Sequence, residues 1–295
     1  MNKDEIIDEI LRILECQSEF IIDTWLQING QTQFATIQKN YTARKNFLYD
    51  FRDQKILHFT NLNSAYAILK SQKLRSSNLS SFANKGGDSE ELSHALRLTN
   101  NFKGDYLALK DHIFVSCFTP LENRGLESFT FHWENYGDNY QGVAFEFEIL
   151  RSYSDDFFLQ VKYLNEIPEK EEMLQLLQNN PTSEQAVIAF SPLLAAIKMT
   201  RYADEKEVRL VTIVGQDDYK LDHIKEHYEI GLDKELNINR RNYYLPFSTP
   251  QKSINQVLLK LHKIHLGEFS SNNNGAIFIK DFLRPLAEEK GVPMV

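Results

Sequence analysis

The amino-acid sequence predicts an α+β protein with a mixed, largely antiparallel sheet and flanking helices. Short segments with the alternation or apolar character of strands recur along the 295 residues, and segments with helical spacing separate them irregularly. A doubly wound parallel sheet would instead show a regular alternation of strands and helices. The sequence also contains no Gly-rich phosphate loop of the GxGxxG or P-loop type.

Strands are expected where apolar residues alternate with polar ones or form a short continuous run. Residues 113–118 are nearly all apolar, which is typical of a buried strand, and residues 143–149 alternate large apolar side chains with glutamates. The predicted strands are 55–61, 112–119, 142–149, 157–164, 206–214, 243–247 and 254–267, with a helix as the alternative for 254–262.

Helical spacing of apolar residues predicts helices over 3–28 and 33–52, with Asn29-Gly30 as the stop between them. These helices form an N-terminal helical extension, residues 1–53, before an α+β core domain, residues 54–295. The extension is a cap, part of the same core, or a dimerisation element that makes a homo-oligomer through its first helix. Further helices are expected at 63–73, capped by Asn63 or Ser64, and at 90–101, 127–136, 168–179, 183–201 and 272–290.

Composition disfavours several classes of protein. Lys and Arg number 33 against 41 Asp and Glu, for a net charge of -8, and no run of five basic residues occurs, so duplex DNA is a disfavoured partner. The two cysteines, Cys16 and Cys117, are too few for a disulfide framework or a four-cysteine zinc site. Acidic residues interrupt the N-terminal segment and no apolar stretch approaches ~20 residues, so we expect a cytoplasmic protein with no membrane partner.

Three charged residues, Glu205, Glu207 and Arg209, occupy alternate positions and share one face of the predicted strand if it extends back to Glu205. Such a row lies either on a solvated strand edge or in a polar cleft. Two carboxylates this close raise each other's pKa unless a cation lies between them, and Arg209 is the candidate cation.

Two further pairs of residues are candidates for ligand contacts. His58 and Thr60 share a strand face and can jointly hydrogen-bond a sugar hydroxyl, unless His58 instead packs against the following helix. Trp133 and Tyr136 are three residues apart on a predicted helix and offer an aromatic face for a flat heterocycle. Core packing is the alternative, and for Trp133 alone it is the favoured interpretation.

Two weaker patterns complete the candidate residues. Ser116 and Thr119 are expected as ligand contacts near a strand end, whereas Cys117 points the other way and is expected to pack as a small buried side chain. The segment from His223 to His227 matches the HxxEH zinc pattern. Its surroundings are heavily charged, so a solvated connecting segment is expected there and no metal.

The succession of ILHFTN, SCFT, FHWENYGDNYQGVAFEFE, EKEVRLV and IHLG resembles a bacterial domain family of unknown function. That family has a W-x-x-Y block and an E-x-E-x-R strand, and the resemblance covers residues 54–268. It is in turn similar to the H-Y-E branch of the ADP-ribosyltransferase superfamily. The resemblance implies a split sheet of the ADP-ribosyltransferase kind.

The resemblance also implies roles for individual residues. Glu207 corresponds to the catalytic glutamate that binds the nicotinamide ribose of NAD, and Glu205 to a second glutamate that positions or deprotonates the acceptor. His58 would contact the adenine-side ribose and Tyr136 would stack on nicotinamide. The remaining residues assigned to NAD binding are Thr60, Trp133, Ser116 and Arg209.

The implied activity is that of an NAD-dependent ADP-ribosyltransferase or an NAD-consuming effector in phage defence or bacterial conflict. NAD is then a substrate, no metal is expected, and the acceptor is a protein, a nucleic acid, a small molecule or water. The alternatives are a non-catalytic nucleotide- or ligand-binding module of the same fold, and a structural or assembly protein.

Overall fold

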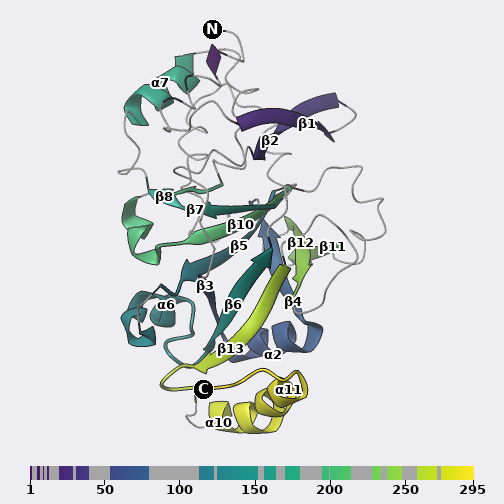
Figure 1. Cartoon of the computed structure of the whole chain (residues 1–295), viewed down its shortest axis with the longest axis vertical. Coiled ribbons are helices and arrows are strands. Elements are labelled where there is room, and N and C mark those ends of the chain that lie inside the picture. Colours follow the sequence, from purple (N-terminus) through teal and green to yellow (C-terminus); the bar gives the residue numbers. More distant parts are fainter. Residues whose placement is uncertain are drawn as a thin grey trace.

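A large sheet forms the centre of the molecule (Figure 1). The computed structural model describes residues 1, 5–6, 9, 12, 20–28, 31–39, 54–79, 113–122, 125–151, 156–163, 170–179, 195–198, 200–213, 228–233, 238–247, 258–270 and 274–295. Every pair of adjacent strands described in the large sheet is antiparallel, and only a separate two-stranded sheet is parallel. The predicted α+β class with a mostly antiparallel sheet is confirmed.

The sheet branches at one strand, β5. The main order is β11-β12-β4-β5-β3-β6-β13, and β10 pairs with both β5 and β7. Near the start of β5, Val115 lies between Ser77 of β4 and Val211 of β10, while near its end Thr119 pairs with Leu57 of β3. The strands are β3 (Lys55–Thr60), β4 (Lys73–Asn78), β5 (Ile113–Pro120), β6 (Val143–Arg151), β7 (Asp156–Gln160), β10 (Val208–Ile213), β11 (Tyr228–Asp233), β12 (Ile238–Pro246) and β13 (Leu258–Leu266).

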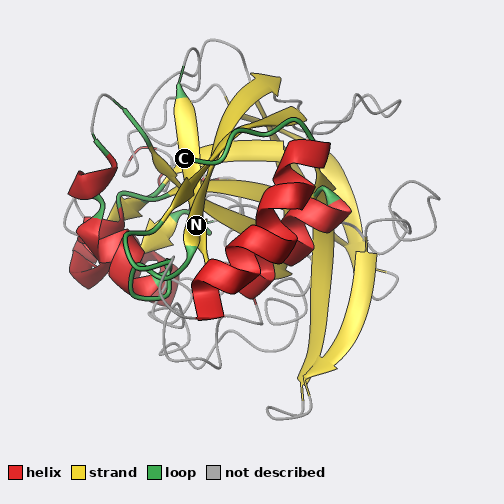
Figure 2. Cartoon of the chain, turned by 90° about the horizontal axis from the view of Figure 1, so that it is seen from below, coloured by secondary structure: helices red, strands yellow, loops and turns green. Residues whose placement is uncertain are grey.

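The main apolar core lies between the sheet and a group of helices at one end of the molecule. These helices lie together at the bottom of Figure 1, and the view from below shows them across the strands (Figure 2). Phenylalanines of β5, β6 and β7 meet there, among them Phe118, Phe147 and Phe158. The covering elements are α2 (Leu62–Ser71), α10 (Asn274–Phe278), the π-helical turn η5 (Ile279–Leu283) and α11 (Arg284–Glu289).

A smaller apolar cluster lies beneath the short helix α6 (Thr130–Asn135), which follows the 3-10 turn η1 (Leu126–Ser128). Trp133 meets Phe59 of β3 edge-on with ring centroids 4.9 Å apart, and its indole N–H donates to the Leu126 carbonyl at 3.2 Å. Because Trp133 is buried in this way, α6 is held against β3. Tyr136, the residue that ends α6, then extends towards the site described below.

A buried ion cluster joins three neighbouring strands. Glu146 of β6 is 3% exposed, yet it accepts from Lys55 of β3 at 2.6 Å and lies 2.6 Å from the His265 ring of β13. Burial opposes the charge of Glu146, but these two partners hold its pKa below the usual value. Glu146 is therefore a paired buried carboxylate and not an isolated one.

The predicted helix 3–28 is wrong over residues 20–28, and the predicted helix 33–52 is wrong over residues 33–39. The structure has an antiparallel hairpin here, β1 (Phe20–Ile28) with β2 (Gln31–Lys39), in which Ile28 pairs with Gln31. β-Branched and aromatic residues favour strands, and Asn-Gly between two strands is a strong hairpin signal. The sequence Asn29-Gly30 was therefore a hairpin signal and not a helix stop.

The structure also refines predictions within the core. Residues 258–266 form a strand, so the helix alternative for 254–262 is wrong over its described part. Asn61, and neither Asn63 nor Ser64, caps α2, by accepting from the Ser64 N–H at 2.8 Å. The remaining elements are α7 (Lys170–Asn179), η3 (Thr200–Glu205), and the parallel pair β8 (Lys162–Tyr163) and β9 (Ile197–Lys198). The expected helix 183–201 is wrong at β9, which lies within it, and η3 begins where that helix was expected to end.

Gly142, where the turn after α6 enters β6, has no room for a side chain. A Cβ built there would lie 2.1 Å from the Thr60 carbonyl oxygen, which is a backbone atom that cannot move freely. We expect Gly142→Ala to lower the free energy of unfolding by about 3 kcal/mol, because the two backbone segments must separate. Urea denaturation followed by circular dichroism measures this.

Gly291→Ala is the matched control for this change. Gly291 has a left-handed backbone, φ 66, but nothing lies within 4 Å of its added Cβ, so the cost is backbone strain alone, about 1 kcal/mol. Equal losses for the two variants would contradict the steric explanation at Gly142.

Candidate functional site

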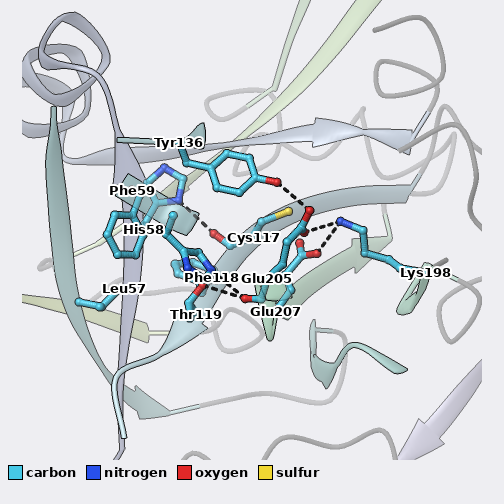
Figure 3. Close-up of a pocket in the computed structure, with 11 residues that line it drawn as sticks. Leu57, His58, Phe59, Cys117, Phe118, Thr119, Tyr136, Lys198, Glu205 and Glu207 are labelled. Carbon is cyan, nitrogen blue, oxygen red and sulfur yellow. Dashed lines mark hydrogen bonds and ion pairs between the residues drawn. The ribbon is translucent and has the colours of Figure 1, made fainter. Parts of the chain in front are cut away.

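A pocket of about 130 Å³ opens beside α6, where β3, β5 and the residues just before β10 come together (Figure 3). Its lining residues come from five separate stretches of the chain, so only the folded protein brings them together. Acidic, basic and aromatic side chains all face it. The described residues that line it are Leu57, His58, Phe59, Cys117, Phe118, Thr119, His132, Tyr136, Lys198, Glu205 and Glu207.

Two buried carboxylates share one ammonium group at the centre of the pocket. Lys198 Nζ lies 2.6 Å from Glu205 Oε2 and 3.0 Å from Glu207 Oε2. All three side chains are at most 5% exposed. Charges taken this far out of water are stable only when they are paired and hydrogen-bonded, so the three groups act as one unit.

Backbone geometry explains why both glutamates face inward. Glu205 ends η3 and β10 begins at Val208, so the pair lies on a turn and not on a regular strand. Between them, the exposed Lys206 has a left-handed backbone, φ 43. The Glu205 carbonyl is itself fixed, because it lies 2.7 Å from His132 Nε2 of α6 and accepts from Thr119 Oγ1 at 3.5 Å.

Glu207 is the more firmly ionised of the two carboxylates. Arg209 Nε donates to its Oε1 at 3.0 Å and Arg209 Nη2 donates to its Oε2 at 3.2 Å. Burial opposes ionisation, but the charges of Arg209 and Lys198 and a hydrogen bond with the Cys117 side chain outweigh it and lower the pKa of Glu207. Arg209, the candidate cation, pairs with Glu207, but the cation that lies between the two carboxylates is Lys198.

Glu205 has the opposite shift. Burial and the nearby negative charge of Glu207 raise the pKa of Glu205 above its usual value, against the lowering effect of Lys198 and Tyr136. Tyr136 is 46% exposed, and its hydroxyl donates to Glu205 Oε1 at 2.9 Å. Burial of the hydroxyl and the Glu205 charge raise the pKa of Tyr136, so the phenol stays protonated. Tyr136 thus lies between the exterior and the Glu205 carboxylate.

His58 lies on the β3 side of the pocket as a neutral imidazole. Its Nδ1 is 3.0 Å from the Cys117 carbonyl oxygen, which can only accept, so Nδ1 carries the proton. Burial lowers the pKa of His58, with the charge of Arg75 acting in the same direction. The ring packs against Phe118, with centroids 5.9 Å apart. In the neutral ring Nε2 is an acceptor, which suits a hydroxyl donor.

The pocket contains some of the predicted ligand residues and leaves others outside its described lining. His58, Tyr136, Glu205, Glu207 and Thr119 line it. Trp133 is buried in the cluster beneath α6, as core packing requires, and Arg209 lies behind Glu207 with 1% exposure. Ser116 lies away from the pocket and pairs with Ser76, and Thr60 is also outside the lining.

Two of the predicted alternatives are corrected by burial. The row Glu205, Glu207 and Arg209 is not on a solvated edge, because all three residues are buried and β10 lies between β5 and β7. Cys117 was expected to pack away from any site, but it is partly exposed and lines the pocket. Its neighbour Ser116 takes the buried position instead, since alternate strand residues face opposite sides.

Lys198 and His132 were not identified from the sequence. Lys198 stands in AAIKMTRY, which has helical spacing and was assigned to a helix, whereas the structure gives it the two-residue strand β9 paired with Tyr163 of β8. A single lysine in an apolar segment that precedes two glutamates was the available signal, since a buried lysine needs an anionic partner. His132 gave no separate signal beside Trp133.

Residues 132–210 match a family described as protein of unknown function (DUF2971). This region runs from α6 to β10 and carries Tyr136, Lys198, Glu205 and Glu207, so the part of the chain that is similar to this family holds most of the charged part of the pocket. Searches of curated proteins and of solved structures gave no significant match. The comparisons therefore assign no activity.

The other two expectations concern metal and membrane. The HxxEH segment from His223 to His227 lies outside the described residues. Among the residues that the structure describes, no group of three His, Cys, Asp or Glu side chains could hold a metal ion. Within the same part of the chain, none of the helices has the length and apolar character needed to cross a membrane.

The buried pair of Arg209 and Glu207 yields a stability prediction. Arg209→Met leaves the Glu207 carboxylate buried with one of its cations removed, so we expect the free energy of unfolding to fall by about 3–5 kcal/mol. Urea denaturation at neutral pH measures the loss. Arg201→Met, an exposed arginine in the neighbouring η3, is the control and should change stability by less than about 0.5 kcal/mol. A loss of similar size in both variants would refute a specific role of the buried pair.

Proposed function

We propose that this protein cleaves the N-glycosidic bond of NAD and transfers the ADP-ribose group to an acceptor. The convergence of His58, Tyr136, Glu205 and Glu207 on one pocket supports this proposal. These residues are widely separated in the sequence, and they are the four to which the ADP-ribosyltransferase resemblance assigns the central roles. The branched antiparallel sheet that carries them is compatible with the split sheet of that superfamily.

The size and lining of the pocket favour one ring-sized group. Pockets that enclose whole drug-sized ligands have volumes of roughly 300–1,000 Å³, and this one has about 130 Å³. It therefore suits the nicotinamide end of NAD, with the rest of the dinucleotide outside the described pocket. Tyr136 and Phe118 supply aromatic surface, and the carboxylates suit the positive charge of the nicotinamide ring.

The two carboxylates have complementary chemical roles in such a reaction. Cleavage sends the bonding electron pair to the nicotinamide nitrogen, which becomes neutral, and leaves an oxocarbenium-like ribose. Glu207, kept ionised by Arg209 and Lys198, stabilises that positive charge in a water-poor pocket. Glu205, whose pKa is raised, accepts the acceptor's proton as the new C–X or C–O bond forms.

A non-catalytic binding module of the same fold is the second candidate. The observation that favours it is the pairing of both Glu207 oxygens with Arg209 and Lys198. A carboxylate neutralised by two cations stabilises a substrate cation less than a single free charge would. A module of this kind would bind NAD or a related nucleotide and release no nicotinamide.

The central prediction concerns Glu207. We expect wild-type protein to release nicotinamide from NAD and Glu207→Gln to lose about 100-fold of that rate or more, because a neutral amide does not stabilise the oxocarbenium charge. Chromatography of free nicotinamide measures the rate, both in buffer and with a bacterial lysate as a source of acceptors.

Glu134→Gln is the matched control, because Glu134 is an exposed glutamate on α6. It should keep the wild-type rate. If wild type binds NAD but releases no nicotinamide under either condition, the binding module replaces the transferase. If it does not bind NAD at all, both candidates fail.

Tyr136 provides a separate test of the aromatic wall. Tyr136→Phe keeps the ring but removes the hydrogen bond with Glu205, whereas Tyr136→Ala removes both. We expect nicotinamide to bind about 10-fold more weakly to Tyr136→Ala, since stacking on an aromatic face contributes on the order of 1–1.5 kcal/mol. Tyr136→Phe should bind it nearly as well as wild type in isothermal titration calorimetry. Equal loss in both variants would show that the hydroxyl, and not the ring, holds the ligand.

A further inference from the structure

Lys198 lines the pocket and contacts both of its carboxylates. The resemblance assigns no role to this lysine. It is 2% exposed, and its ammonium lies 4.9 Å from the centroid of the Tyr202 ring as well as between the two carboxylates. A buried lysine loses considerable hydration energy, so its position requires compensating negative charge. Here that charge comes from two glutamates at once.

We propose that Lys198 is a positioning residue that acts as a shared counter-ion: it keeps both carboxylates ionised in the resting protein and shifts its pairing to Glu207 when Glu205 takes up a proton. This inference rests on the proposed function, because it explains how one carboxylate exchanges a proton beside another that must stay charged. The transferase proposal alone contains neither Lys198 nor this change of ion pairing.

The geometry supports a shift between the two partners. The two contacts of Lys198 Nζ go to the Oε2 atoms of both glutamates, so one ammonium bridges them without a large movement. Glu205 also accepts from Tyr136, while Glu207 also accepts from Arg209. When Glu205 becomes neutral, the attraction of Lys198 to it weakens, and the remaining carboxylate holds the ammonium more strongly.

Several titratable groups surround this bridge and enter its charge balance. Glu205, Glu207, Lys198 and Arg209 carry formal charges that cancel in pairs. The neighbouring groups are neutral or backbone-bonded: the Tyr163 hydroxyl accepts from the Glu207 N–H at 3.2 Å, and burial with the Glu207 charge raises the pKa of Tyr163. The groups that face the bridge from the packed elements are Tyr136 and His132 of α6, Tyr163 of β8, Cys117 of β5, His58 of β3 and Tyr202 of η3.

The proton balance of the step is simple. The acceptor X–H gives its proton to Glu205 as X bonds to the ribose carbon, and the nicotinamide leaves with the electron pair of the broken C–N bond. Glu205 then returns the proton to solvent, with Tyr136 at the exposed side of the carboxylate. Lys198 gains and loses no proton, so it balances charge without taking part in a bond.

A carboxyl titration tests this role without NAD. Protein labelled with ¹³C at the glutamate carboxyl is titrated by NMR as wild type, Lys198→Met and Lys198→Arg. Without the ammonium, two carboxylates this close cannot both ionise easily, so Lys198→Met should raise the apparent pKa of the pair by about two units or more. Lys198→Arg keeps the charge and should keep the wild-type titration. An unchanged titration in folded Lys198→Met would overturn the proposal.

A double variant covers the case in which Lys198→Met does not fold. If Lys198 balances two charges, adding Glu205→Gln should restore folding to Lys198→Met, because Arg209 still pairs with the one remaining carboxylate, Glu207. A double variant that also fails to fold would mean that Lys198 only packs. Because neither readout uses NAD, the proposal on Lys198 can fail while nicotinamide release succeeds. If the protein titrates as expected but releases no nicotinamide, the transferase proposal fails and the counter-ion role of Lys198 stands.

Discussion

The shared ion bridge from Glu205 through Lys198 to Glu207 is the constraint on which the pocket depends. Each of these groups would be unstable alone in a buried position, because loss of hydration costs several kcal/mol per ion. Together with Arg209 they form a compensated set, so the fold can keep four charges away from water. Such a set adds little to the stability of a core, since a protein with apolar residues of the same size in its place is often at least as stable. Three of its members, Glu205, Glu207 and Lys198, line the pocket.

The sheet supplies the support for this bridge. β5 pairs with β4, β10 and β3, so residues of different strands meet at the pocket. These are His58 from β3, Cys117 from β5 itself and Glu207 from just before β10. The short helix α6 is fixed by Trp133 in the smaller apolar cluster, and this anchoring orients Tyr136 over the carboxylates. The rigid elements therefore lie behind the pocket, whereas its charged side chains lie at strand ends and turns, where side chains can face an open space.

The sequence predicted the parts of this arrangement that depend on local pattern. Alternation identified β3, β6 and β10. The family resemblance, and not a local pattern, grouped His58 with Glu205 and Glu207, and the structure has all three in the pocket lining. Lys198 could not be placed in this way, because its two-residue strand β9 leaves no periodic signal and pairs with β8, which lies far away in the sequence. The hairpin of β1 and β2 was missed for another reason: apolar residues such as Ile21, Trp25 and Ile28 satisfy helical spacing as well as strand pairing, and strand propensity with the Asn-Gly turn decides between them.

The buried Glu146 has a consequence for the geometry of the pocket. Glu146 faces Leu57 of β3 directly, and its carboxylate is held by Lys55 on one side and His265 on the other. A slip of β3 or β13 by one residue would reverse which side chains face the core and would separate this charge from its partners. The ion cluster therefore fixes the register of three adjacent strands. Since His58 is only three residues from Lys55, that register also sets how far His58 lies from Glu205, so an ion cluster outside the described pocket lining determines a distance within the pocket.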